Sequence, residues 1–102
     1  MEEQIFIDSV FEVPSSGKKI KDLLKSLPID PGVYRFLDES KHPIYIGKAK
    51  NLRNRISSYF RGVSNQSKKT KKLLKNSKSL EITLTTTELE ALLLEQFLIK
   101  EK

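Results

Sequence analysis

"GVYRFLDESKHPIYIGKAKNLRNRISSYF", residues 32–60, contains two glycine–tyrosine motifs, Gly32-Val33-Tyr34 and Tyr45-Ile46-Gly47. An apolar run includes each motif, and the polar residues 38–42 between the runs favour a turn. The stretch therefore predicts an antiparallel pair of strands. If the turn centres near residues 39–40, Tyr34 and Tyr45 lie directly opposite each other on one face, with their Cβ atoms about 5 Å apart.

Polar side chains recur at helical spacing after the second motif. On a helical wheel they cluster within about 80°, beside an apolar sector formed by Ala49, Leu52, Ile56 and Phe60. The polar set is Lys48, Asn51, Arg55 and Tyr59. The pattern predicts a helix that packs on the sheet and aligns these groups with the sheet tyrosines. A solvated basic face beside ordinary core aromatics is the alternative for such a helix taken alone.

The residues on either side of this stretch predict an arm, a further helix and a further strand. Residues 1–14 read as an N-terminal arm, followed by a single domain over 15–102. A helix is predicted after Ser15-Ser16, with apolar side chains at i, i+3, i+4 and i+7 from Ile20 to Leu27, and Pro28 ends it. Clean alternation predicts a strand over 80–84, in addition to strands over 33–37 and 44–47. The expected fold class is α/β (α+β).

A capping box formed by Thr87 and Glu90 places the start of the last helix. Residues 89–99 are apolar nearly all round, which predicts a helix buried on most sides. Glu95 lies in the middle of this apolar run, where an ionised carboxylate is costly unless a cation accompanies it. The residues leave two alternatives open: a structural salt bridge, or a divalent cation that keeps mostly water ligands.

Composition restricts the possible functions. Lysine and arginine number 19 against 13 acidic residues, so the net charge is +6 and favours a polyanionic partner, nucleic acid ahead of an acidic membrane surface. The absence of cysteine excludes disulfides and thiol nucleophiles, and one histidine, His42 in the turn, gives acyl-transfer triads no support. No apolar run approaches the roughly 20 residues of a membrane span, and the N-terminus is unlike a signal peptide. We therefore expect a cytoplasmic protein without a membrane partner.

Six lysines lie between residues 68 and 78. This segment is either a solvated, marginal helix or a surface that contacts phosphates without reading sequence. The candidate DNA contacts on it are Lys68, Lys69, Lys71 and Lys72, and Lys18, Lys19, Lys21 and Lys25 could extend the surface.

Three segments together resemble the GIY-YIG nuclease family: "LPIDPGVYRF", "PIYIGKAKNLRNRISSYF" and "TLTTTELEALLLEQFLIK". Within that family they are most similar to the N-terminal endonuclease domain of the excinuclease UvrC of bacterial nucleotide excision repair. The resemblance spans about residues 28–100. It implies a small three-stranded antiparallel sheet flanked by helices, in agreement with the elements predicted from the residues.

The resemblance also implies a role for each site residue. Tyr45 resembles the general base that activates water, and Tyr34 its partner on the neighbouring strand. Arg55 resembles the arginine that steadies the scissile phosphate, and Glu95 the metal ligand. The further matches are Lys48 and Tyr59 as catalytic residues, Asn51 as a DNA contact, and Gly32 and Gly47 as positions where backbones approach closely. Lys48 and Arg55, with a metal, would stabilise a Tyr45 phenolate, because an unperturbed tyrosine has a pKa of about 10.

The implied activity is that of a metal-dependent DNA endonuclease that cuts on the 3′ side of a lesion, with a single Mg²⁺ or Mn²⁺. The implied partners are damaged duplex DNA and, in a full-length protein, the excinuclease component UvrB; the isolated domain is expected to be monomeric. The family continues beyond the position of Lys102 to an asparagine that helps build the site. The alternatives are another GIY-YIG endonuclease, of a homing or structure-selective type, and a non-catalytic basic DNA-binding module with the same fold.

Overall fold

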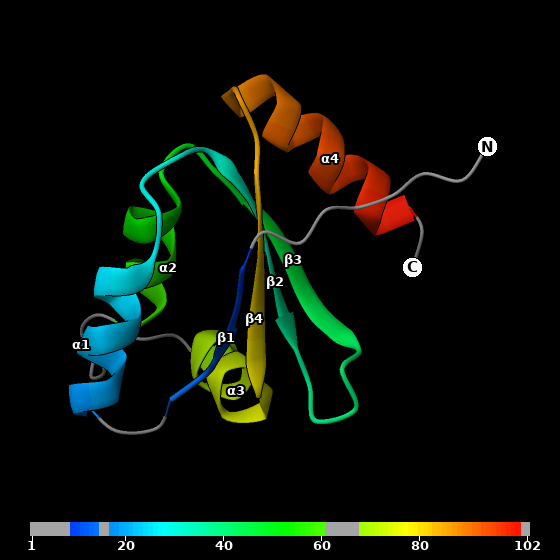
Figure 1. The fold of residues 1–102 in the computed structure, drawn as a ribbon. Coiled ribbons are helices and arrows are strands. Elements are labelled where there is room, and N and C mark those ends of the chain that lie inside the picture. Colours follow the sequence, from blue (N-terminus) through cyan, green and yellow to red (C-terminus); the bar gives the residue numbers. More distant parts are fainter. Residues whose placement is uncertain (1–8, 15–16, 61–67, 101–102) are drawn as a thin grey trace.

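The computed structural model describes residues 9–14, 17–60 and 68–100, and within them the chain forms one four-stranded antiparallel sheet with helices on both faces (Figure 1). The strand order is β1-β4-β2-β3. The strands are β1 (Ser9–Glu12), β2 (Gly32–Leu37), β3 (Pro43–Ala49) and β4 (Ser79–Leu84). The predicted mixed class and antiparallel sheet are confirmed, but the sheet has a fourth strand. It arises because residues 9–12 of the predicted arm pair with the free edge of β4.

Three helices cover one face of the sheet and the fourth covers part of the other (Figure 1). The first three are α1 (Gly17–Ser26), α2 (Leu52–Phe60) and α3 (Lys68–Asn76), and the fourth is α4 (Glu88–Lys100). Side chains alternate across the sheet: Tyr34 and Phe36 pack with Ile56 in the larger core, whereas Val33 packs with Ala91 in the smaller one. No described helix has the length and apolar character that crossing a membrane requires.

The register of the β2–β3 hairpin differs from the predicted one by two residues. Tyr34 pairs with Gly47 and Phe36 with Tyr45, so the two tyrosines are diagonal neighbours and are not directly opposite. Their ring centroids are 6.2 Å apart. The prediction of direct opposition was wrong because it assumed a hairpin without extra residues.

Two extra residues on the β3 side cause this shift. The turn is centred on residues 39–40 as predicted, because the Lys41 N–H donates to the Asp38 carbonyl at 2.9 Å, but Lys41 itself has φ 66° and is one inserted residue. Ile44 is the second, since it lies between the pairs Leu37–Pro43 and Phe36–Tyr45. Two insertions preserve the alternation of side chains, and Tyr34 and Tyr45 therefore still share one face.

The helix that follows the hairpin begins later than predicted. Strand β3 continues to Ala49, so Lys48 lies in the sheet opposite Val33, and its helical spacing to Arg55 is coincidental. Asn51 precedes α2, where its Oδ1 accepts the Asn54 N–H at 3.0 Å. Asn51 is therefore the N-cap of α2.

Helix α2, which carries Arg55 and Tyr59, is held against the end of α1. The Arg53 Nε donates to the Leu27 carbonyl at 2.9 Å, and its Nη2 donates to the Lys25 carbonyl at 3.1 Å. These carbonyls lie at the C-terminal end of α1, which Pro28 ends as predicted. One arginine therefore joins the two helices.

Helix α4 starts where the capping box predicted but is more exposed than expected. The Glu90 N–H donates to Thr87 Oγ1 at 3.1 Å, and the Glu90 carboxylate accepts the Thr86 N–H at 2.7 Å. Within the helix only Ala91 and Leu98 are buried, whereas Leu89, Leu93 and Ile99 are 63%, 57% and 50% exposed. The prediction of burial on most sides was wrong, because the described residues pack on α4 mainly from β2 and β3.

Candidate active site

An open groove of about 610 Å³ follows the β3 edge of the sheet and joins residues from both faces. Tyr45 and Gly47 face the α2 side, and Lys48 lies on the opposite face. Because β3 is an edge strand, Glu95 from α4 can line the same groove as Tyr45 and Arg55. Of the six predicted catalytic and metal-binding residues, the structure places five along this groove: Tyr34, Tyr45, Lys48, Arg55 and Glu95.

Tyr34, Arg55 and Tyr59 form a hydrogen-bonded cluster at the floor of the groove. The hydroxyl oxygens of Tyr34 and Tyr59 are 2.8 Å apart, and the Arg55 Nε donates to the Tyr34 hydroxyl at 3.2 Å. The Arg55 guanidinium also lies 5.5 Å from the centre of the Tyr59 ring, a cation–π distance. Tyr59, which does not line the first groove, is therefore connected to the other predicted site residues through Tyr34. Arg55 is held by the hydroxyl of Tyr34 and by the ring of Tyr59.

Gly47 is required by the position of the Tyr34 ring. A Cβ at residue 47 would lie 2.5 Å from both Cζ and the hydroxyl oxygen of Tyr34. At Gly32 a Cβ would lie 2.4 Å from the Thr83 carbonyl oxygen. The predicted close approach of backbones is therefore found at Gly32, whereas at Gly47 the group that approaches is the Tyr34 side chain and not a backbone.

The ionisation of this cluster follows from its burial. Burial raises the pKa of Tyr34 above the ordinary value of 10.0, although hydrogen bonds to Tyr59 and Arg55 oppose the shift. Burial also raises the pKa of Tyr59, and the hydrogen bond to Tyr34 adds to this rise. The hydrogen bond that Arg55 donates to Tyr34 raises the pKa of Arg55, which remains a cation. Both tyrosines are therefore neutral near pH 7 and suit hydrogen bonding better than proton abstraction.

Tyr45 is the most accessible of the three tyrosines. Its side chain is 38% exposed, whereas Tyr34 is 0% exposed. Its ring centroid lies 6.2 Å from that of Tyr59, so the tyrosine cluster supports one side of the ring. A water or a phosphate can reach the Tyr45 hydroxyl, and it cannot reach Tyr34 without a rearrangement.

Glu95 is half-buried on α4 and lines the groove. Among the described residues the one ion pair joins Arg35 and Glu81, at 2.6 Å. The salt-bridge alternative for Glu95 therefore gains no support from these residues. The described part of the chain also has no group of three or more His, Cys, Asp or Glu side chains suited to a metal. A hard cation in the groove would have Glu95 and water as its ligands.

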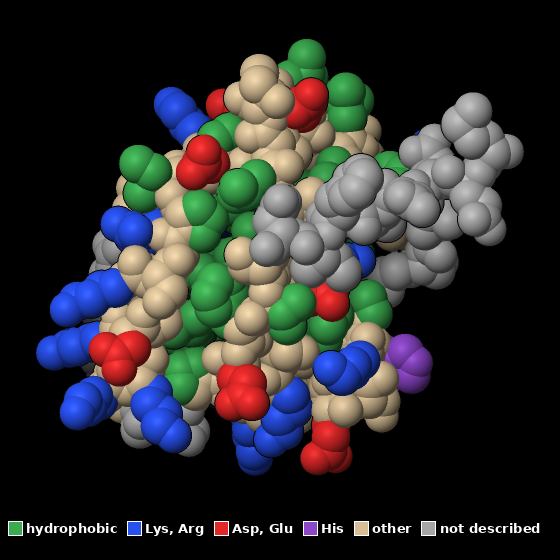
Figure 2. Space-filling model, in the orientation of Figure 1, with side chains coloured by type: hydrophobic (Ala, Val, Ile, Leu, Met, Phe, Trp, Pro, Cys, Tyr) green, Lys and Arg blue, Asp and Glu red, His purple; other side chains and the backbone are tan. Residues whose placement is uncertain are grey.

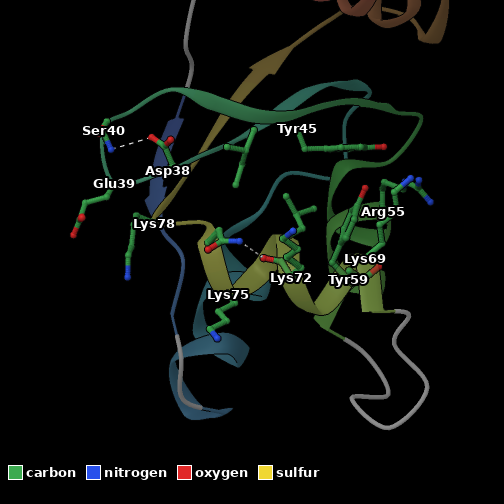
Figure 3. Close-up of a pocket in the computed structure, with 14 residues that line it drawn as sticks. Asp38, Glu39, Ser40, Tyr45, Arg55, Tyr59, Lys69, Lys72, Lys75 and Lys78 are labelled. Atoms are coloured by element: carbon green, nitrogen blue, oxygen red, sulfur yellow. Dashed lines mark hydrogen bonds between the residues drawn. The ribbon is translucent and has the colours of Figure 1, made fainter.

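A second groove, of about 950 Å³, shares Tyr45 and Arg55 with the first and extends between the hairpin and α3 (Figure 3). Of the four lysines predicted to contact DNA, Lys69 and Lys72 line it, whereas Lys68 and Lys71 do not. Figure 2 shows Lys and Arg side chains projecting from the side formed by α1. The lysines of α1 line neither groove.

Comparison with protein families agrees with this geometry. Residues 30–102 match the family model of the UvrC-like GIY-YIG domain. The chain belongs to this family. The UvrC-like GIY-YIG domain is 50% identical over 82 residues to UvrABC system protein C of Cytophaga hutchinsonii and 52% identical over 80 residues to that of Hahella chejuensis. These alignments cover 80% and 78% of the chain but only 14% and 13% of the relatives.

Solved structures agree with this assignment. The UvrC-like GIY-YIG domain matches the N-terminal GIY-YIG endonuclease domain of UvrC from Thermotoga maritima, bound to magnesium as its catalytic divalent cation. The TM-score is 0.72 at 38% identity, and the match covers 84% of this chain and 92% of that one. A tyrosine-to-phenylalanine variant of the same domain, also bound to the cation, matches with a TM-score of 0.70.

Several residues of the UvrC-like GIY-YIG domain line the two grooves without having been predicted. Lys50, Asn54 and Ser58 line the first groove, and Lys75 and Lys78 line the second. Asn54 follows Asn51 by three residues and Ser58 follows Arg55 by three, so helical periodicity could have indicated both. The hydrogen bond between Tyr34 and Tyr59 joins residues 25 positions apart, and no local pattern predicts it.

Proposed function

We propose that this UvrC-like GIY-YIG domain is a divalent-cation-dependent DNA endonuclease that hydrolyses a phosphodiester bond on the 3′ side of a lesion. The observation that carries this function is the meeting of Tyr45, Arg55 and Glu95 in one groove, although they come from a strand and from helices on opposite faces of the sheet. The three supply a proton acceptor, a phosphate-binding fork and a carboxylate for a cation. A binding module without catalysis would not need this combination.

Tyr45 is the proposed general base. Tyr45 is exposed and lines the groove, so its hydroxyl can accept a proton from a water there, and the cationic side chains of Lys48 and Arg55 along the same groove offset the charge of the phosphate. Tyr34 and Tyr59 remain neutral and act as positioning residues for Arg55. A guanidinium held in this way can present its terminal N–H groups to two phosphate oxygens.

The donor set fits a single Mg²⁺ or Mn²⁺. Glu95 would hold it through a carboxylate oxygen, the ligand type that hard cations prefer, and water would complete the coordination. When bound, the cation supplies charge neutralisation at the phosphate and at the leaving oxygen. In a longer protein with this domain, damaged duplex DNA and the excinuclease component UvrB are the proposed partners.

The first prediction concerns Tyr45. Tyr45→Phe keeps the ring and removes the hydroxyl, so we expect magnesium-dependent nicking of damaged duplex DNA, with UvrB present, to slow by about 100- to 10,000-fold. DNA affinity should not change. Tyr59→Phe is the matched control, since it also removes one hydroxyl from the cluster, and it should slow nicking less. Full activity of Tyr45→Phe would exclude Tyr45 as the base.

A further inference from the structure

The groove between α3 and the hairpin begins at the proposed site, which it shares through Tyr45 and Arg55. In Figure 3 Arg55, Tyr59 and Lys69 gather at one end, Lys72 lies between, and Asp38, Glu39 and Lys78 lie at the other. A chain of phosphates that leaves Arg55 along this groove therefore meets Lys69 and Lys72 first. Both side chains are exposed, so neither lysine is committed to the core.

The acidic end limits how far a polyanion can follow the groove. Asp38 is part of the turn, where its Oδ1 accepts the N–H groups of Ser40 and His42, both at 2.9 Å. Its carboxylate is therefore held at the tip of the hairpin, next to Glu39. Phosphates at this end would face two carboxylates and one lysine, Lys78, whereas at the other end they meet Arg55 and Lys69, which favours contacts at the end near Arg55.

Helix α3 presents its lysines in two directions. Lys69 and Lys72, three residues apart, line the groove, whereas Lys68 and Lys71, with the same spacing, do not. The helix is fixed in this orientation because Leu73 and Leu74 pack against the larger core. Rotation of α3 that would exchange the two pairs would remove these contacts.

From this arrangement we infer that the groove binds the sugar–phosphate backbone of the cleaved DNA strand on one side of the scissile bond, through Lys69 and Lys72 but not through Lys68 and Lys71. The inference rests on the proposed nuclease function and adds the path of the strand. Lysines act here as point charges on phosphates, so this contact holds the strand without reading its bases. Helix α3 has no aromatic side chain, so it offers the strand phosphate contacts and no base stacking.

The test compares two matched double variants of this chain. The groove pair is Lys69→Ala/Lys72→Ala, and the control pair is Lys68→Ala/Lys71→Ala. Each removes two charges from the same helix at the same spacing. Binding to a fluorescein-labelled duplex oligonucleotide is measured in EDTA over a series of salt concentrations. The groove pair should lower the slope of log K against log salt by about 1 to 2, because each lost phosphate contact removes about 0.9 from the slope for duplex DNA. The control pair should change it by much less.

Nicking assays separate this inference from the proposed function. The groove pair should lose nicking activity at low DNA concentration and recover it at saturating DNA, since its contacts serve binding and not the chemical step. If the wild type binds DNA but does not nick it, the nuclease proposal fails while the salt slopes still test the groove. Equal slope changes in both pairs, or none in either, would overturn the inference. Thermal melting of each variant, with Lys69→Gln/Lys72→Gln as a second version, excludes misfolding as the cause.

Discussion

At the residue scale, the three tyrosines of the site differ in environment and therefore in chemistry. Tyr34 is fully buried and hydrogen-bonded to Tyr59 and Arg55. Burial raises the pKa of Tyr34 and that of Tyr59. Tyr45 is exposed on the edge strand. The residue type is the same in the three cases, and the depth in the sheet separates a positioning role from the proposed base.

The raised pKa values predict how stability depends on alkaline pH. Because the folded state holds the Tyr34 and Tyr59 protons more tightly than the unfolded chain, the free energy of unfolding should be unaffected by them below pH 10 and should fall as pH rises above it. Each protected tyrosine adds about 1.4 kcal/mol per pH unit to the fall. Urea unfolding at several alkaline pH values measures this slope. Tyr34→Phe should have a shallower slope, and an identical slope would mean that Tyr34 ionises normally.

At the element scale, the hairpin and its edge position create the site. The two inserted residues on the β3 side, Lys41 and Ile44, place Gly47 opposite Tyr34, and the missing Cβ leaves room for the Tyr34 ring. The same ring then reaches Arg55 and Tyr59 on α2. Packing of β2, β3 and α2 therefore depends on one glycine in the edge strand.

Gly47→Ala tests this dependence. The new Cβ would lie 2.5 Å from the buried end of the Tyr34 side chain, so the ring or the strand must move. We expect a loss of about 1–3 kcal/mol in the free energy of unfolding, typical of overpacking, and a loss of nicking activity because Arg55 loses its partner. Gly17→Ala is the control, since no atom lies within 4 Å of its added Cβ. If urea unfolding gives equal stabilities for the two variants, the fit of Tyr34 over Gly47 is not required.

Local patterns predicted the elements better than their environments. Capping at Thr87 and alternation in 80–84 depend on neighbours in sequence, and both are confirmed. The burial of α4 depends on what lies across from it, and apolar composition alone suggested more contacts than the described residues make. Lys48 was assigned to a helix because its spacing to Arg55 fits one by coincidence, whereas strand pairing extends β3 to Ala49. Glu95 and Tyr45 belong to different faces of the sheet, so no local pattern brings them together, and only the family resemblance gave both a role in one site.

At the scale of the whole molecule, the sheet separates two cores, and residues from both faces line one groove at the β3 edge. The larger core fixes Tyr34 and Ile56, and the smaller core fixes α4 through Ala91 and Leu98. Glu95 and Tyr45 are therefore held by different cores, and a cation bound at Glu95 would be stabilised by the folded arrangement as a whole. Such a cation binds the folded state and not the unfolded chain, so its binding must appear in the stability of the entire domain.

Thermal melting of the wild type and Glu95→Gln, with and without Mg²⁺ or Mn²⁺, tests this central claim. In metal-free buffer the two should have similar stabilities, because Glu95 is half-buried and has no ion pair among the described residues. A cation at about 100 times its Kd should stabilise the wild type by about 2.7 kcal/mol, which raises the Tm by at least about 10 °C in a domain of this size. Glu95→Gln should show no such rise, whereas Glu88→Gln, which removes the same charge from the start of α4, should keep it. If Glu95→Gln instead loses about 3–5 kcal/mol without metal, and neither protein responds to the cation, Glu95 is a structural residue and the proposed metal site is wrong.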